Sequence, residues 1–272
     1  MKKVCAILMA VCLLLAGLCP ALAEEKTYTI GICQLAPHPA LDAATKGFRD
    51  FLTEKLGDRV VFDEQNAAGE AATCMQIMNS FISEDVDLIM ANATASLQAA
   101  QSATGDIPIL GTAVTDYGVA LDLTCVDGKT GVNISGTSDL APLDQQAAMI
   151  KELFPEAKEV GLLYCSSEAN SAYQIEVMTQ ELTKLGFRCT EFAFSDSSDV
   201  TSMTSTACQN SDVIYVPTDN VVATCAEAIR NVAEVDRVPI IAGEEGACAG
   251  CGVATLSISY YELGRITGEM AF

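Results

Sequence analysis

The sequence predicts an α/β protein of two lobes, each built on a parallel sheet. Residues 87–113 and 212–244 repeat one strand–helix–strand pattern, and a shorter echo pairs residues 28–33 with 158–163. Repeats of this kind indicate two copies of one structural unit. Because polar side chains stand at matching loops of the two copies, we expect a site between the lobes.

The sheets should be parallel because the expected strands are continuous apolar runs rather than alternating ones. Such runs occur where helices cover both faces of a sheet, and strands that alternate with helices predict right-handed βαβ units. The expected strands are residues 27–33, 60–63, 88–91, 109–112, 131–135, 160–164, 188–194, 213–216, 240–242 and 254–257.

The intervening helices show one apolar face at three- and four-residue spacing. The first carries Leu41, Ala44, Phe48, Phe51 and Leu52 on this face, and a later one carries Ile175, Met178, Leu182 and Leu185 before Gly186 ends it. The two halves of the chain meet near residues 135–139 without a proline- or serine-rich linker, which predicts a short crossing rather than a flexible tether.

Ligands of open parallel sheets bind beyond the carboxyl ends of the strands. This rule selects the loops at residues 34–39, 92–96, 113–118, 166–171, 217–220 and 243–252.

The first 23 residues are typical of a signal peptide. Lys2 and Lys3 precede an apolar run, and a small-residue cleavage site ends at Ala23. Cys19 leaves a lipid anchor open as the alternative to a soluble exported protein. No later stretch has the length and apolarity of a membrane span.

A formal net charge of −21 argues against nucleic acid or anionic lipid as partners. The twelve cysteines, three of them in the leader, do not form the framework of a small disulfide-rich protein, because most lie in apolar strand or helix patterns. The only close pair is Cys248 and Cys251, which is weak as a metal site. A local disulfide or a loop without chemistry is the preferred interpretation of that pair.

Catalytic motifs are scarce. His38 is the only histidine, and the phosphate- and dinucleotide-binding glycine patterns and the nucleophile elbow are missing. Loop carboxylates exist, but nothing marks two of them as acid and base. We therefore predict a protein that is not an enzyme and has no cofactor or metal, and leave His38 open as a cleft residue or a bystander.

Binding chemistry is better supplied. Thr94 and Asp219 each precede an expected helix as N-caps, which stabilise a helix by about 1 kcal/mol. Residues 94–96 would offer backbone N–H groups to a carboxylate. The expected ligand loops contain acidic residues and no arginine, which suits a ligand with an ammonium group. An amino acid therefore fits better than phosphate or sulfate, which usually bind to arginine. The alternative is that these acids merely reflect the acidic composition of the chain. The lack of tryptophan disfavours sugars.

Residues 34–43, 111–116, 167–171, 216–220 and 261–268 together resemble the ABC transporter substrate-binding proteins of the tryptophan/tyrosine (TrpX-like) group. The resemblance implies a type I periplasmic-binding-protein fold: two Rossmann-like lobes, a hinge, and a small solute caught between them for a membrane permease and its ATPase. It divides the chain into a signal peptide (1–23), an N-terminal lobe (24–137), a C-terminal lobe (138–258) and a return segment to the first lobe (259–272).

The favoured ligand is an aromatic or hydrophobic amino acid, bound by a monomer. The expected ligand contacts are Gln34, His38, Thr94, Ala95, Ser96, Thr112, Asp116, Glu168, Asn170, Asp219, Asn220 and Glu244. The alternatives are the ligand-binding sensor domain of a signalling receptor and, more distantly, an enzyme using His38 for proton transfer.

The family usually continues beyond the return segment, so the chain is expected to be C-terminally truncated at Phe272. Its last residues should form a helix whose apolar face holds Leu263, Ile266 and Met270, with Gly264 and Gly268 permitting close packing on the first lobe.

Overall fold

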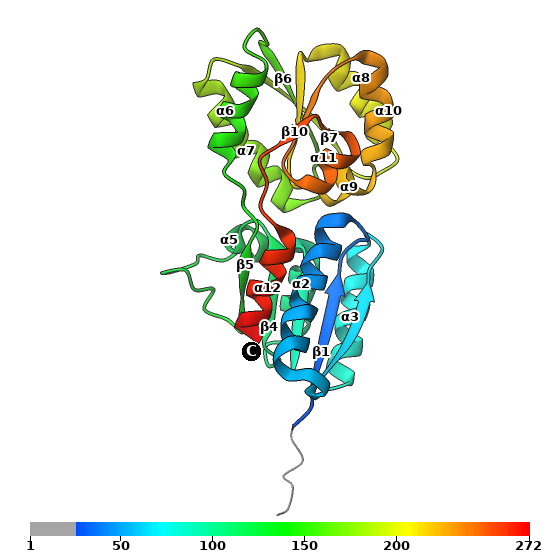
Figure 1. The fold of residues 1–272 in the computed structure, drawn as a ribbon, viewed down its shortest axis with the longest axis vertical. Coiled ribbons are helices and arrows are strands. Elements are labelled where there is room, and N and C mark those ends of the chain that lie inside the picture. The colour runs from blue at the N-terminus through cyan, green and yellow to red at the C-terminus, as the bar shows by residue number, and fades with distance from the viewer. Residues whose placement is uncertain (1–25) are drawn as a thin grey trace, which may run out of the picture.

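The computed structural model describes residues 26–272. The predicted signal peptide, with Cys19 and Ala23, lies outside the described residues. The chain forms two lobes stacked end to end, each with a five-stranded parallel sheet (Figure 1). The expected α/β architecture with two parallel sheets is confirmed.

The first lobe has the strand order β2-β1-β3-β4-β5. Its elements in chain order are β1 (Tyr28–Gln34), α2 (Pro39–Leu56), η1 (Gly57–Arg59), β2 (Val60–Asn66), α3 (Ala71–Ser83), β3 (Leu88–Asn92), α4 (Thr94–Ala103), β4 (Ile109–Val114), α5 (Tyr117–Leu121) and β5 (Ile134–Ser138).

The second lobe has the order β10-β9-β8-β6-β7. It contains α6 (Leu143–Leu153), β6 (Glu159–Cys165), α7 (Ala169–Lys184), β7 (Arg188–Phe194), α8 (Val200–Asn210), β8 (Val213–Val216), α9 (Asn220–Thr224), α10 (Ala226–Asp236), β9 (Ile240–Ala242), α11 (Glu245–Cys251) and β10 (Ala254–Thr255).

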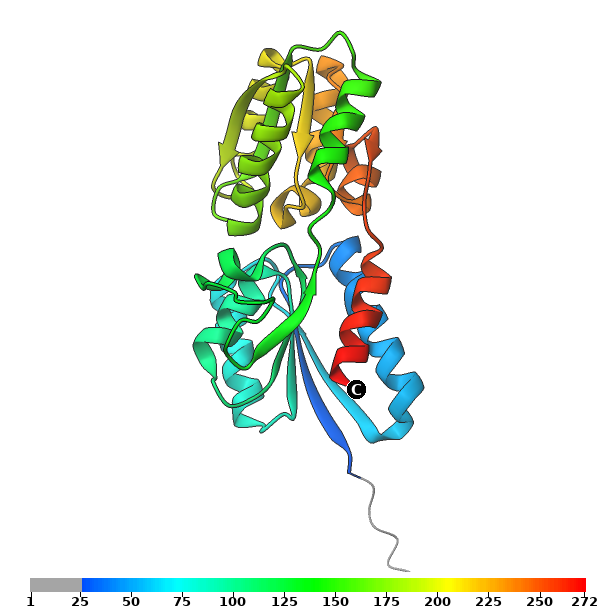
Figure 2. The same ribbon diagram turned by 90° about the vertical axis from the view of Figure 1, so that its left-hand side faces the viewer.

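The chain passes between the lobes twice in the described residues (Figures 1 and 2). The first passage follows β5, and the second leads from β10 to α12 (Tyr260–Ala271), which returns to the first lobe and lies along α2. The first passage lies beside residues 135–139, where a crossing was expected, and the second precedes the return segment that the resemblance implies at residues 259–272.

Glycines set the contact between α12 and α2. A Cβ atom on Gly264 would lie 1.9 Å from the carbonyl oxygen of Ala44, and one on Gly47 would lie 2.0 Å from that of Tyr261. The close packing predicted for Gly264 is therefore confirmed. The predicted apolar face is wrong in part: Leu263 is buried, but Ile266 and Met270 are 51% and 44% exposed. The buried stripe instead follows the small residues that let the helix backbones approach.

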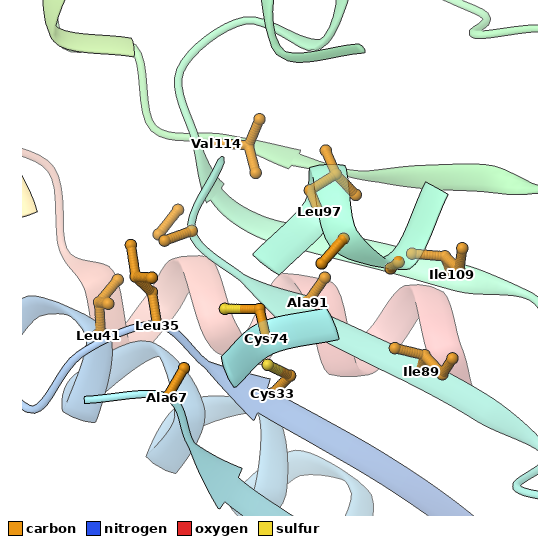
Figure 3. Close-up of a cluster of buried hydrophobic side chains, with 14 of the residues drawn as sticks. Cys33, Leu35, Leu41, Ala67, Cys74, Ile89, Ala91, Leu97, Ile109 and Val114 are labelled. Carbon is orange, nitrogen blue, oxygen red and sulfur yellow. The ribbon is translucent and has the colours of Figure 1, made fainter. Parts of the chain in front are cut away.

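Each sheet is buried between helices, as the continuous apolar strands predicted. Figure 3 shows part of the first lobe's core, in which Cys33 of β1 and Cys74 of α3 pack among aliphatic side chains. Both thiols lie 3.5 Å from the hydroxyl of Ser96. All nine cysteines of the described residues are free, so Cys248 and Cys251 form no local disulfide; they lie in α11.

Several strand boundaries differ from the sequence prediction. The strand expected at residues 131–135 is β5 at residues 134–138, because Gly131 adopts a φ of +76° and the chain is still turning there. β2 extends to Asn66, which pairs with Gln34. The last strand is shorter than expected, since the carbonyl of Leu256 leaves the sheet to accept from Gln146.

Candidate ligand-binding site

A narrow cavity between the lobes brings together polar side chains from both. Its water-accessible volume is about 20 Å³, room for one or two waters, so a larger solute enters only if the lobes or lining side chains move. The cavity is lined by His38, Ala40, Leu41, Ala113, Thr115, Asp139, Asn170, Thr218, Asp219, Asn220, Ala223, Glu244 and Tyr260.

Two larger hollows lie on the outer surface of the first lobe. One, of about 740 Å³, lies between α2 and β2, and the other, of about 810 Å³, lies beside β5 under the loop that follows α5. Each is lined by residues of the first lobe alone. The site shared by the two lobes is therefore the smaller cavity.

Two of the buried carboxylates in the cavity cap short helices of the second lobe. Asp219 follows β8 and accepts from the backbone N–H of Val222 at 2.8 Å and from that of Cys165 at 2.7 Å. Glu244 follows β9 and accepts from the N–H groups of Gly246 and Ala247. Both caps hold carboxylates at the carboxyl ends of parallel strands, where the fold binds ligands.

The third carboxylate links the two interlobe passages. Asp139, just after β5, accepts from the Tyr260 hydroxyl at 2.8 Å and from the Thr115 hydroxyl at 3.1 Å. Gln174 of the second lobe donates to the same Thr115 hydroxyl at 3.1 Å. This network therefore joins both passages and both lobes around one carboxylate.

The cavity holds three buried carboxyl groups and no cationic side chain among its lining residues. These carboxyl groups are Asp139, Asp219 and Glu244, each at most 4% exposed. Burial raises the pKa of all three carboxyl groups, and the charge of Asp139 contributes to the raised pKa of Glu244. A cationic group placed here would restore the balance of charge, since a buried carboxylate is costly without a partner.

A direct side-chain contact closes the other side of the cavity. His38 precedes α2 in the first lobe, and its Nε2 lies 3.1 Å from Oδ1 of Asn220 in the second. The Asn220 amide donates through Nδ2 to Glu168 at 2.6 Å, and Glu168 also accepts from the backbone N–H groups of Asn220 and Val221. Glu168 thus stands behind the cavity wall and orients Asn220.

The structure brings five of the residues expected from the sequence to the cavity: His38, Asn170, Asp219, Asn220 and Glu244. It places the others elsewhere. Gln34 bonds Asp42 and Thr45, Thr112 bonds Thr267 under α12, and Asp116 caps α5. Thr94 and Ser96 are buried at the start of α4, outside the cavity, and Ala95 packs against the first lobe's core.

The predicted cap at Asp219 is confirmed, and the one at Thr94 is wrong. The chain turns at Ala93 with a φ of +88°, so Ala93 holds the cap position and Thr94 is the first residue of α4. The helix start that reaches the cavity is that of α2, where Ala40 and Leu41 line it and no side chain caps the backbone.

Sequence reasoning missed Thr115, Asp139, Thr218 and Tyr260. The rule that ligands bind beyond the carboxyl ends of strands could have found Asp139, because Asp139 directly follows β5. The sequence analysis expected this strand three residues too early, at residues 131–135. Tyr260 reaches the cavity because α12 packs back onto the first lobe, and a local sequence pattern does not reveal such a long-range contact.

Residues 26–272 contain no group of three or more side chains suited to hold a metal ion. Within the same range, no helix combines the length and apolarity needed to cross a membrane.

Two parallel-sheet lobes with a buried polar cavity between them define a two-lobed binding protein, and the fold is that of the type I periplasmic binding proteins. The family model for ABC transporter substrate binding proteins matches residues 29–272. The chain belongs to this family.

The chain is similar to a curated relative from Clostridioides difficile described as a tyrosine-binding protein. The two are 40% identical over 251 residues, which cover 91% of this chain and 72% of that protein.

Two solved structures are informative about the arrangement of the lobes. A domain from Streptococcus pneumoniae in complex with L-Trp is 31% identical, with a TM-score of 0.87. A ligand-free, open substrate-binding protein with adhesive properties from Clostridium difficile is 40% identical, with a TM-score of 0.66. Each comparison covers 90% of this chain and 84% of the other. The chain therefore superposes better on the L-Trp complex than on the ligand-free, open protein, although the latter is more similar in sequence.

Proposed function

We propose that the protein is the exported solute-binding component of an ABC importer and that it captures an aromatic amino acid between its lobes. The observation that carries this proposal is the cluster of buried carboxylates in the interlobe cavity, with no cationic side chain lining it. The family supports the role, and a membrane permease with its ATPase would receive the solute.

Asp139 and Glu244 are the expected partners of the ligand's ammonium group. Asp139 lies directly after β5, where the chain leaves the first lobe, and Glu244 lies on the second lobe; the charge of Asp139 contributes to the raised pKa of Glu244. Each of their oxygens has one hydrogen-bond partner in the protein and can accept a second bond. An ammonium group between them would bind best when the lobes are closed, which couples binding to closure.

The ligand's carboxylate would lie at the start of α2. This helix has 18 residues and no side-chain cap, so its first N–H groups and partial positive charge are available to an anion. Ala40 and Leu41 belong to this first turn and line the cavity. This proposal puts the ligand's carboxylate at a different helix start of the same lobe from the one expected at Thr94.

The aromatic side chain is supported by the relatives rather than by an aromatic cage. The tyrosine-binding protein and the L-Trp complex point to this ligand class. The apolar lining of Leu41, Ala113 and Ala223 is compatible with this ligand class, and the two alanines leave room for a ring once the lobes part.

Isothermal titration of the purified protein with each common amino acid tests the proposal. We expect L-tyrosine or L-tryptophan to bind most tightly, and 3-(4-hydroxyphenyl)propionate, which lacks the ammonium group, to bind far more weakly. Equal binding of the two tyrosine-like compounds would contradict the role of the carboxylates. Failure of every amino acid to bind would contradict the proposed ligand class.

A further inference from the structure

His38 has one ring nitrogen with a partner and one without. Nε2 meets Asn220 across the lobes at 3.1 Å, whereas Nδ1 is buried and has no hydrogen-bond partner in the protein. The side chain is 7% exposed and lines the interlobe cavity. A buried polar atom without a partner is costly, so a group that satisfies Nδ1 would gain from it.

The neighbours of His38 determine which nitrogen carries the proton. Asn220 donates through Nδ2 to the Glu168 carboxylate, which fixes its amide orientation and turns Oδ1 toward the histidine. Because an amide oxygen only accepts, Nε2 of His38 must donate. In the neutral ring Nδ1 is then an acceptor. Burial lowers the pKa of His38, with smaller opposing contributions from Asn220 and Asp42, and this favours the neutral form.

We infer that Nδ1 of His38 accepts a hydrogen bond from an N–H or O–H group of the bound amino acid, and that Asn220 and Glu168 fix the required tautomer when the lobes close. The inference rests on the proposed function. It makes His38 a reporter of closure, because the tautomer is set by the second lobe while the ring belongs to the first. The donor is either the ammonium group or a ring group such as the phenol of tyrosine.

The histidine is alone in the sequence, so nitrogen-15 histidine labelling reports this side chain without assignment. We expect a neutral ring with the proton on Nε2, and an upfield shift of the Nδ1 resonance when the protein is saturated with L-tyrosine. L-Phenylalanine, which has no ring donor, separates the two sources: a shift with both ligands assigns the ammonium group, and a shift with tyrosine alone assigns the phenol.

A matched pair of variants provides the second measurement. His38→Gln keeps a donor near the position of Nε2 and removes the acceptor at Nδ1, whereas His38→Asn keeps an acceptor near Nδ1 and removes the contact with Asn220. We expect the Gln variant to raise the Kd about tenfold or more, the range for loss of a buried hydrogen bond, and the Asn variant to raise it less. Circular dichroism checks the fold of both.

Binding of L-tyrosine without a shift of Nδ1, a ring protonated on both nitrogens in the complex, or a larger loss in His38→Asn than in His38→Gln would each overturn the inference and leave the proposed function standing. Failure of all amino acids to bind overturns both.

Discussion

Asp139 is the residue on which the proposed site depends most. It is 4% exposed, accepts from hydroxyl groups of Tyr260 and Thr115, and has no cationic partner among the cavity residues. Hydroxyl donors do not neutralise its charge, unlike an ammonium group. The same carboxyl group joins the two interlobe passages and, in the proposed site, would accept from the ligand's ammonium group.

Replacing Asp139 by Asn should weaken binding of an aromatic amino acid by about 1.5–3 kcal/mol, the range for hydrogen bonds to charged groups. The amide keeps the size of the side chain and removes its charge. Asp116→Asn is the matched control, because Asp116 caps α5 outside the cavity. Titration calorimetry measures both, and equal affinities of the two variants would show that Asp139 does not bind the ligand.

Glu168 gives a pH dependence of stability. Burial, followed by the charge of Asp219, raises the pKa of Glu168 from 4.5 to about 7. The stability that a raised pKa contributes is complete below about pH 4.5 and is lost as the pH rises through about 7. We expect the wild-type Tm to fall relative to that of Glu168→Gln as the pH rises from about 4.5 to about 7, and the difference to level off above that range.

Thermal unfolding of both proteins without ligand, across this range, checks the prediction. Because the other buried acids are common to both proteins, the difference between the two melting temperatures isolates Glu168 and its coupling to Asp219. Two parallel curves would show that the Glu168 carboxyl titrates in the folded protein as it does in the unfolded chain.

At the scale of elements, the return of α12 onto α2 adds a helix to the first lobe and brings Tyr260 to the cavity. The two helices approach closely because Gly47 and Gly264 face the opposing backbone. Ser259 caps α12 by accepting from the N–H of Glu262, and Tyr260 follows in the first turn. Packing between these two helices therefore positions a residue of the ligand site.

Gly264→Ala should lower the free energy of unfolding by about 1–3 kcal/mol, the usual cost of overpacking. The added methyl group would meet the Ala44 carbonyl at 1.9 Å, so the helices must separate. Gly105→Ala is the control, because no atom lies within 4 Å of the added group. Urea unfolding measures the free energy of unfolding of both variants. Equal values would show that α2 and α12 can move apart without loss of stability.

Local patterns in the sequence predicted much of the fold and part of the site. Apolar runs located the strands, and Asp219 was recognisable as a cap because capping depends on its immediate neighbours. Thr94 was wrongly assigned as a cap because Ala93 adopts a positive φ, which is unusual for alanine and cannot be foreseen from the sequence. Asp139 and Tyr260 lie 121 residues apart and meet only through the tertiary fold, so periodicity could not place them in one site.

At the scale of the whole molecule, two lobes joined by two passages enclose a cavity that can hold a solute between them. His38 and Asn220 meet across the lobes, as do Thr115 and Gln174. The better superposition on the L-Trp complex than on the open relative agrees with a closed arrangement. Since the cavity is narrow, opening must precede entry of an amino acid, and closure then surrounds it.

A crystal structure of the protein with L-tyrosine or L-tryptophan tests the central claim most directly. The account predicts ligand density between the lobes, with the ammonium group within hydrogen-bonding distance of Asp139 and Glu244 and the carboxylate at the start of α2. Density confined to either hollow on the outer surface of the first lobe, or an ammonium group turned away from both carboxylates, would contradict it.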